Sequence, residues 1–175
     1  MKRVIVIGGN GSGKTTMSRS LSEITGLPLT HLDSLYWTDG WVPRAREEFD
    51  ALLASELEKD EWILDGNMRR TLPLRLQYCD TVVYLDFSGM RCFFGTLTRV
   101  IRNRGRVRPD MGGDCREKLD LRTWGFIFST LKFNKINRKN MYERIAEHPE
   151  VTLIVLKNRR QVKKFLQKLE GENKK

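Results

Sequence analysis

The sequence of 175 residues has no apolar run long enough to span a bilayer, which argues against a transmembrane helix. Its first residues join a short basic start to an apolar run. That run is too short for the core of a signal peptide, and no small-residue cleavage site follows it. A buried strand explains the run better, so we expect a cytoplasmic protein with no membrane partner.

Cysteine is scarce, with only Cys79, Cys92 and Cys115, which lie far apart in the chain. An odd number of cysteines without a C-x-x-C pair argues against both a disulfide framework and a zinc site. We therefore expect reduced, partly buried thiols. Internal repeats and long low-complexity tracts are also lacking, and the length fits one domain over residues 1–175.

Acidic residues are outnumbered: 22 Asp and Glu stand against 32 Lys and Arg, which gives a formal net charge of +10. The 39% share of hydrophobic residues is nevertheless normal for a soluble globular protein. A balance this basic favours anionic partners, namely nucleotides, phosphorylated small molecules or nucleic acid. It does not choose among them.

Apolar runs alternate with segments of helical periodicity along the whole chain. The expected strands are residues 4–7, 27–33, 61–67, 81–87 and 151–156. The expected helices are residues 14–24, 43–60, 72–77 and 91–102, a long helical region after residue 114, and a basic C-terminal helix that ends before Gly171. This alternation predicts an α/β fold, a parallel sheet with helices on both faces in three layers.

The glycine-rich stretch from Gly8 to Thr15 matches G-x-x-x-x-G-K-[ST]. Its glycines allow a tight turn whose N–H groups surround a phosphate, and the following helix adds its positive dipole end. Lys14 would reach the β- and γ-phosphates of ATP, and the Thr15 hydroxyl would bind Mg²⁺. The expected ATP-binding residues are Gly8, Gly9, Asn10, Gly11, Ser12, Gly13, Lys14, Thr15 and Thr16.

Two other interpretations of this stretch fit the sequence less well. The dinucleotide fingerprint G-x-G-x-x-G fails, because its third glycine falls on Lys14 or Thr16. A purely structural glycine turn is less consistent with a motif that follows a strand and opens a helix. A phosphate-binding loop alone does not specify the reaction.

Three expected strands end in an aspartate, namely Asp33, Asp65 and Asp86. Ligands of open parallel sheets bind at this edge, so each carboxylate is a candidate. Asp65 and Asp86 compete for a water-mediated Mg²⁺ role, with a cap or turn role as the alternative. Asp33 would hold or deprotonate an acceptor hydroxyl, or cap a turn. We expect His31 to be packed or hydrogen-bonded rather than a base.

An arginine cluster lies around the glycine- and proline-broken loop of residues 103–114. It comprises Arg99, Arg102, Arg104, Arg106 and Arg108. Since no acid lies between Arg91 and Pro109, the cluster fits a lid that closes on phosphates and stabilises transition-state charge, with Arg99 and Arg104 as catalytic groups. The alternatives are a nucleic-acid patch and a solvated surface.

Two aromatic groups are also notable. Residues 36–43 place two tryptophans beside an Asp-Gly turn, where they flank a substrate pocket or cover the core. Trp124, Ile127, Phe128 and Leu131 recur at helical spacing. We interpret this second group as core packing.

The order of these parts resembles the adenylate-kinase-like family of P-loop kinases. Within it, "HLDSLYWTDGW", "WILDGNMRRTL" and the "RGRVRPDM…C" lid are most similar to the bacterial proteins labelled "DNA topology modulation protein". The resemblance covers nearly the whole chain. It implies a three-layer P-loop NTPase fold like that of nucleoside monophosphate kinases, with ATP and Mg²⁺ as cofactors.

Site residues are implied where this sequence matches the family pattern. Asp65 and Gly66 match the start of the D-G-F-P-R segment, whose arginine contacts the acceptor phosphate and is represented here by Arg69. Asn67 and Met68 depart from that segment, and T-G-[DE]-x-[LI]-R, which binds the acceptor in adenylate kinases, is missing. AMP as acceptor is therefore in doubt.

A hydroxyl-bearing small molecule held by Asp33 is as arguable an acceptor as a nucleotide. Arg159 lies where such kinases pack the adenine. Three functions follow: a Mg-ATP-dependent kinase for a nucleotide or other small molecule, a nucleic-acid-associated protein that uses ATP as a switch, or a protein that binds nucleotide without transferring phosphate. We rank the kinase first.

Overall fold

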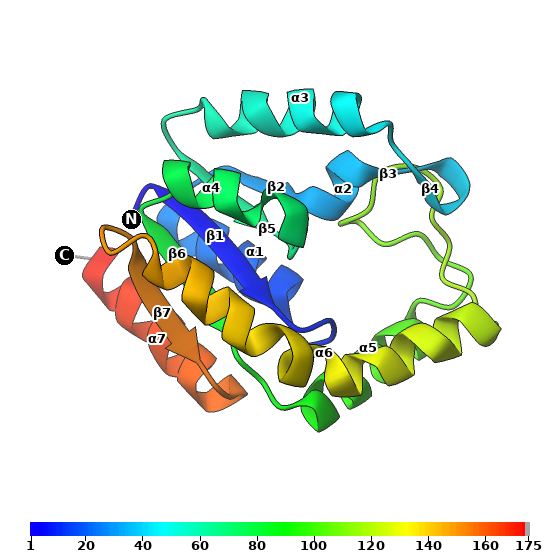
Figure 1. Cartoon of the computed structure of the whole chain (residues 1–175). Helices are drawn as coiled ribbons and strands as arrows, with labels where there is room; N and C mark the ends of the chain where they lie inside the picture. The colour runs from blue at the N-terminus through cyan, green and yellow to red at the C-terminus, as the bar shows by residue number, and fades with distance from the viewer. Residues whose placement is uncertain (174–175) are drawn as a thin grey trace.

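A computed structural model describes residues 1–173, with residues 133 and 134 described by their backbone alone. Five parallel strands form one sheet in the order β2-β5-β1-β6-β7, and helices cover both of its faces (Figure 1). The strands of the sheet are β1 (Arg3–Gly8), β2 (Leu29–His31), β5 (Trp62–Asp65), β6 (Thr81–Leu85) and β7 (Thr152–Leu156). The α/β three-layer prediction is confirmed.

The helices flank this sheet and follow its strands in the chain. They are α1 (Lys14–Thr25), α2 (Leu32–Tyr36), α3 (Arg46–Leu57), α4 (Leu72–Tyr78), α5 (Gly89–Arg102), α6 (Leu121–Ala146) and α7 (Arg159–Asn173). Short 3-10 turns, η1 (Asp39–Trp41) and η2 (Arg69–Thr71), stand within two of the connections. Among the described residues, no helix is both long and apolar enough to cross a membrane.

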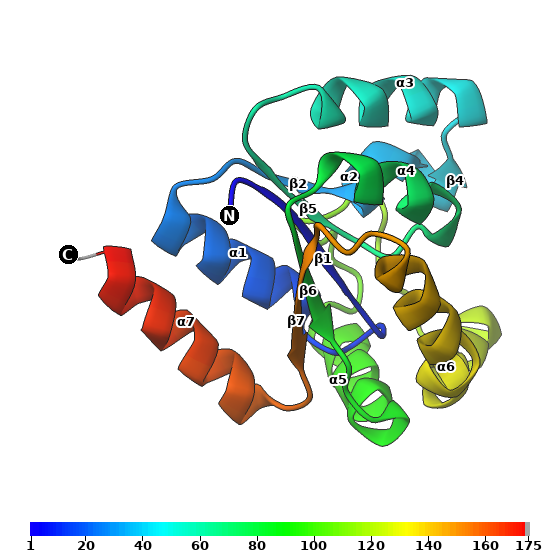
Figure 2. The same ribbon diagram turned by 60° about the vertical axis from the view of Figure 1, so that its left-hand side comes forward.

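Alternation along β1 builds two cores, because successive side chains of a strand point to opposite faces. Ile5 and Ile7 face a core completed by α2, α3, α4 and α6. Val4 and Val6 face the second core, which α1 and α7 cover (Figure 2). All four side chains are fully buried. Burial on both faces is what the uninterrupted β-branched run predicts.

Several element boundaries differ from the sequence-based predictions. Strand β2 ends at His31, so Asp33 stands in the first turn of α2 instead of at a strand end. Pro43 does not open a helix: it lies in β4 (Val42–Pro43), and α3 begins at Arg46. Gly171 lies inside α7 because that helix continues to Asn173.

The stripe predicted to pack in the core is only partly buried. Ile127 is fully buried, whereas Trp124 and Phe128 are exposed on α6. The prediction failed because α6 turns one narrow side to the sheet, and spacing alone does not say which side of a helix faces the core.

A short hairpin, β3 (Trp37–Thr38) with β4, contains the aromatic segment. Residues 103–120, which we call the connecting segment, join α5 to α6 and pack against this hairpin. Asp114 donates its backbone N–H to Asp39 Oδ1 at 2.7 Å, and Trp41 Nε1 donates to the Arg116 carbonyl at 3.0 Å. Trp41 therefore serves the contact with the connecting segment, and the Trp37 ring packs against Trp41.

All three cysteines are free and buried, as the sequence indicated. Burial raises the pKa of Cys79 to about 12 and also raises the pKa of Cys92. Cys115 is fully buried in the connecting segment, where its Sγ donates to the Thr38 carbonyl at 3.2 Å.

Candidate active site

The glycine-rich loop runs from β1 to the first residue of α1, as its motif predicts. Gly13 forms the N-cap of α1 in a left-handed conformation, with φ of 93°. Lys14 turns back over the loop and donates from Nζ to the carbonyls of Gly8 at 2.9 Å and Gly9 at 3.2 Å. The ammonium group is thus held directly above the concavity that the loop forms.

The loop is supported from outside by α5. A Cβ on Gly11 would lie 2.3 Å from the Cys92 carbonyl oxygen, and one on Gly95 would lie 2.1 Å from the Gly11 carbonyl oxygen. This close approach of helix and loop requires glycine at both positions. The position of the loop therefore depends on α5.

The sheet register places His31 directly opposite Asp65 in the pairing of β2 with β5. The His31 Nδ1 atom lies 2.9 Å from Asp65 Oδ2. His31 is therefore hydrogen-bonded, as expected, and its partner is one of the candidate metal ligands. The other carboxylate oxygen of Asp65, Oδ1, is buried without a hydrogen-bond partner among the described residues.

Asn67 and Arg75 are functional candidates that sequence reasoning missed. Asn67 accepts from the Gly8 N–H at 3.0 Å and donates to the Gly8 carbonyl at 2.7 Å, so it ties the β5 edge to the loop. Arg75 is fully buried and donates to the carbonyls of Gly66 at 3.0 Å and Asn67 at 2.6 Å. Only the departure of Asn67 from the family's segment marked its position in the sequence.

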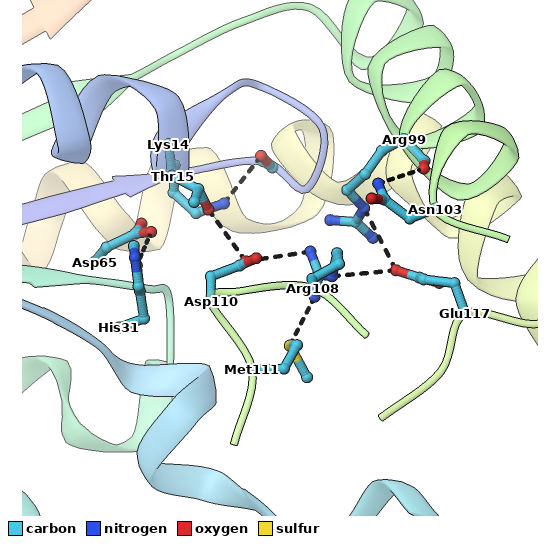
Figure 3. A network of polar contacts seen from close by, with 11 residues as sticks. Lys14, Thr15, His31, Asp65, Arg99, Asn103, Arg108, Asp110, Met111 and Glu117 are labelled. Atoms are coloured by element: carbon cyan, nitrogen blue, oxygen red, sulfur yellow. Dashed lines mark hydrogen bonds and ion pairs between the residues drawn. The ribbon is translucent and has the colours of Figure 1, made fainter. Parts of the chain in front are cut away.

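The connecting segment brings its own acids to the site (Figure 3). Arg108 forms ion pairs with Asp110 and Glu117, each at 3.3 Å, and Arg99 lies 3.7 Å from Glu117. Thr15 Oγ1 donates to Asp110 Oδ2 at 3.4 Å. The arginine cluster is therefore partly neutralised by carboxylates that follow it in the chain, just beyond the acid-free stretch.

Two cavities adjoin the loop. The inner cavity, of about 240 Å³, lies against the strand ends and is lined by Asn10, His31, Asp33, Asp65, Gly66 and Arg69, among others. The P-loop groove, of about 880 Å³, runs along α5 and is lined by Gly11, Gly13, Thr16, Met90, Phe94 and Arg159, among others. Both are also lined by Lys14, Thr15, Arg99, Arg108 and Asp110. The cavities thus meet at the lysine of the loop.

Burial dominates the electrostatics where the cavities meet. It lowers the pKa of Lys14, although the nearby carboxylates of Asp65 and Asp33 act in the opposite direction. It raises the pKa of Asp33, against the opposing effect of Lys14 and Arg108. Burial also lowers the pKa of Arg99, and Arg108 adds to that effect. These directions are those of charges withdrawn from water but close to opposite charges.

Not every predicted site residue is at the cavities. Arg104 is exposed and lines neither of them. Asp86 is also absent from both linings, and its contacts are with α6, where Arg138 binds it at 2.7 Å and Tyr142 donates to it at 3.1 Å. These α6 contacts leave Asp65 as the strand-end carboxylate near the loop. Arg69 lines the inner cavity, where its Nη1 donates to Asn137 Oδ1.

Thr15 and Asp65 are the residues expected to serve Mg²⁺, and their chemistry fits it. Mg²⁺ prefers oxygen ligands and keeps several waters, and Asp65 Oδ1 is an unpaired buried oxygen. Among the residues described, no group of three or more His, Cys, Asp or Glu could hold a metal alone.

Among solved structures, the chain is similar to a shikimate kinase from Acinetobacter baumannii in complex with shikimate, at 17% identity over 97% of this chain and 90% of that chain, with a TM-score of 0.60. A gluconokinase from Sinorhizobium meliloti matches at 13% identity over 99% and 91%, with a TM-score of 0.56. The fold is that of the P-loop kinases. A shikimate kinase from Bacteroides thetaiotaomicron agrees, at 15% identity over 99% of both chains with a TM-score of 0.52.

These identities establish the fold alone. No protein-family model and no curated protein matches the chain. The comparisons therefore support a P-loop kinase fold of the kind found in nucleoside monophosphate kinases, and give no support to the "DNA topology modulation" label or to a nucleic-acid partner.

Proposed function

We propose that this protein is a Mg-ATP-dependent kinase that transfers the γ-phosphoryl group to a hydroxyl of a small molecule. The observation that carries the proposal is the meeting of the two cavities at Lys14 and Thr15. A nucleotide in the P-loop groove would place its terminal phosphate where an acceptor in the inner cavity can reach it. Positioning of this kind supplies much of the catalysis in phosphoryl transfer.

The P-loop groove suits ATP at both of its ends. The loop N–H groups and the α1 dipole would bind the phosphates, and Lys14 would exchange its two carbonyl partners for phosphate oxygens. Met90 and Phe94 offer apolar surface for the base, with Arg159 at the start of α7 beside the same groove. Mg²⁺, held by Thr15 and near Asp65, would neutralise phosphate charge.

The inner cavity suits a small polar acceptor. Its carboxylates are Asp33, Asp65 and Asp110, and its cations include Arg69. A volume of about 240 Å³ matches the size of a small molecule. We assign Asp33 to the acceptor hydroxyl, because Asp65 is already bonded to His31 and Asp110 to Thr15.

In the transfer step, the acceptor oxygen forms a bond to the γ-phosphorus while the bond from that phosphorus to the β–γ bridging oxygen breaks. ADP leaves with the bond electrons, and the hydroxyl proton passes to Asp33. Its raised pKa favours proton acceptance. We propose that residues 103–114 act as a lid from which Arg108, together with Arg99 of α5, stabilises charge on the transferring group.

An ATP-consumption screen tests the proposal with nucleoside monophosphates, nucleosides, sugars and small hydroxy acids as acceptors. One acceptor class should raise ATP consumption above the basal rate, and Lys14→Ala should lower transfer by about a hundredfold or more while the fold survives. The exposed Lys163→Ala on α7 is the control and should transfer normally. ATP binding without transfer to any acceptor, or normal transfer by Lys14→Ala, would contradict a kinase.

A further inference from the structure

Two segments of the chain carry positive charge with no acidic residue of their own. Residues 89–109 and 121–142 together hold 11 of the 32 Lys and Arg and no Asp or Glu, so the remaining 21 basic residues are matched by all 22 acidic ones. The two segments are α5 with the start of the connecting segment and most of α6. These helices pack against each other, with Phe93 of α5 5.6 Å from Phe128 of α6.

Most of these basic side chains form no ion pair with the acidic residues that the structure describes. Four of the 11 basic residues contact acidic side chains of other segments: Arg99, Arg108, Arg138 and Lys139. The other seven have no acidic partner within the described part of the chain. This region is therefore a field of uncompensated positive charge.

Exposed apolar side chains are concentrated in the same region. Of the 14 large apolar side chains exposed among the described residues, nine lie in these two segments. Met90 and Phe94 line the P-loop groove, which accounts for them. The extremes lie on α6, where Leu121 is 90% exposed and Ile136 is 68% exposed.

Leu121 and Ile136 lie on one side of α6 together with four other residues. At about 100° per residue, these six fall within an arc of about 120°. We call them the α6 outer face: Leu121, Trp124, Phe128, Lys132, Lys135 and Ile136. The buried side chains Ile127, Thr130 and Met141 lie on the opposite side. In Figure 1 the N-terminal half of α6 extends away from the sheet, alongside α5.

We infer that the α6 outer face docks on an anionic lipid bilayer. Helices that lie in a membrane interface combine exposed aliphatic and aromatic side chains with lysines. The apolar groups enter the acyl boundary and the lysines bind headgroups. The expectation of no membrane partner rested on the lack of a spanning run, and peripheral docking needs none.

Two other occupants fit the same face less well. A second copy of this chain would bring an equally positive, acid-free surface, and the like charges would repel. A single-stranded nucleic acid needs free aromatic faces for base stacking. Here the most exposed apolar groups are Leu121 and Ile136, and the Phe128 ring already packs against Phe93 and Trp124.

Vesicle flotation of the full chain tests the inference, with phosphatidylcholine alone and mixed with phosphatidylglycerol. We expect binding to the anionic vesicles only, weakened by salt. Lys132→Gln with Lys135→Gln should lower the affinity by about thirtyfold, at about fivefold per charge. Leu121→Gln with Ile136→Gln should lower it by about tenfold or more, since each group leaves water on docking.

Matched controls change the same residue types elsewhere. Lys163→Gln with Lys164→Gln on α7, and Val42→Gln with Leu74→Gln on β4 and α4, should bind vesicles as the native chain does. All changed side chains are exposed, so the melting temperature should change little.

Three results would overturn the inference. The first is no binding to anionic vesicles at low salt, and the second is undiminished binding by the Leu121 and Ile136 variant. The third is a competing occupant of the same face, seen either as a single-stranded oligonucleotide that binds more tightly than vesicles through the same lysines or as self-association that these variants abolish. The test uses no kinase readout, so it is independent of the proposed function.

Discussion

Asp33 is a half-buried carboxylate that lies near both cations and other carboxylates. Burial raises its pKa and is assisted by Asp65 and Asp110, and together they outweigh Lys14 and Arg108, which favour the ionised form. An Asp with a raised pKa stabilises the fold only while it is protonated. That stabilisation is complete below the ordinary carboxyl pKa and is lost as the pH rises through the raised value.

Asp33→Asn should therefore have opposite effects on stability and on transfer. At neutral pH the variant should melt at a higher temperature than the native protein, because it no longer buries a carboxylate. The difference should vanish when the pH falls below the ordinary carboxyl pKa. Thermal melts over this pH range measure it, and phosphoryl transfer should be lost at every pH. A lower melting temperature at neutral pH would show that the attraction of Lys14 and Arg108 for the Asp33 carboxylate outweighs the cost of its burial.

The predictability of single residues depended on whether their role is local. The loop residues Lys14 and Thr15 were found because their chemistry is written into one contiguous motif. The contact of His31 with Asp65 arises from the register of two strands 30 residues apart, which no local pattern encodes. Arg75 was missed because nothing in its neighbourhood marks a buried arginine that binds backbone carbonyls.

Among the elements, helix α5 both lines the P-loop groove and packs against the glycine-rich loop. The Gly11–Gly95 approach is the closest part of this contact. A side chain at either position must push helix and loop apart. The geometry of the loop is therefore set partly by a helix that contributes no residue to the loop motif.

Gly95→Ala should destabilise the fold by about 1–3 kcal/mol, because its Cβ would overlap the Gly11 carbonyl oxygen, and it should also weaken ATP binding. Gly125→Ala on α6 is the matched control, since no atom lies within 4 Å of its added Cβ. That control should stabilise the fold by about 0.5–1 kcal/mol. Urea unfolding and nucleotide titration measure both variants, and equal stability of the two would refute the contact.

Element types were predictable, but their ends and facing sides were not. The five strands of the sheet and the helices other than α2 follow from alternating periodicity, whereas the short α2 was not predicted. Pro43 misled the prediction for α3, because a proline suits a strand at the edge of a hairpin as well as a helix start. The outward turn of Trp124 and Phe128 depends on tertiary packing that α6 alone does not encode.

At the scale of the whole molecule, charge is divided unevenly. The segments 89–109 and 121–142 hold 11 basic residues and no acidic one, while the rest of the chain, in which α7 is also basic, is balanced only when taken together. Like charges crowded on two packed helices repel each other and oppose the compact state. Salt screens this repulsion at the surface.

The melting temperature should therefore rise with NaCl concentration, over a range in which surface ion pairs alone would make it fall. Lys132→Gln with Lys135→Gln should flatten the rise, whereas Lys163→Gln with Lys164→Gln should flatten it less. Scanning calorimetry at several salt concentrations measures the slopes. A melting temperature that falls with salt would mean that the ion pairs outweigh the repulsion.

Cys115 can report how often the connecting segment separates from the hairpin. Its thiol is fully buried and donates to the Thr38 carbonyl, so a thiol reagent reaches it only when the segment leaves the hairpin. The rate at which the reagent labels Cys115, followed by mass spectrometry of the native chain, therefore measures how often the segment leaves the hairpin. Cys79 and Cys92 lie in the cores and should react only on global unfolding. We expect Mg-ATP to change the Cys115 rate and to leave the ratio of the other two rates unchanged.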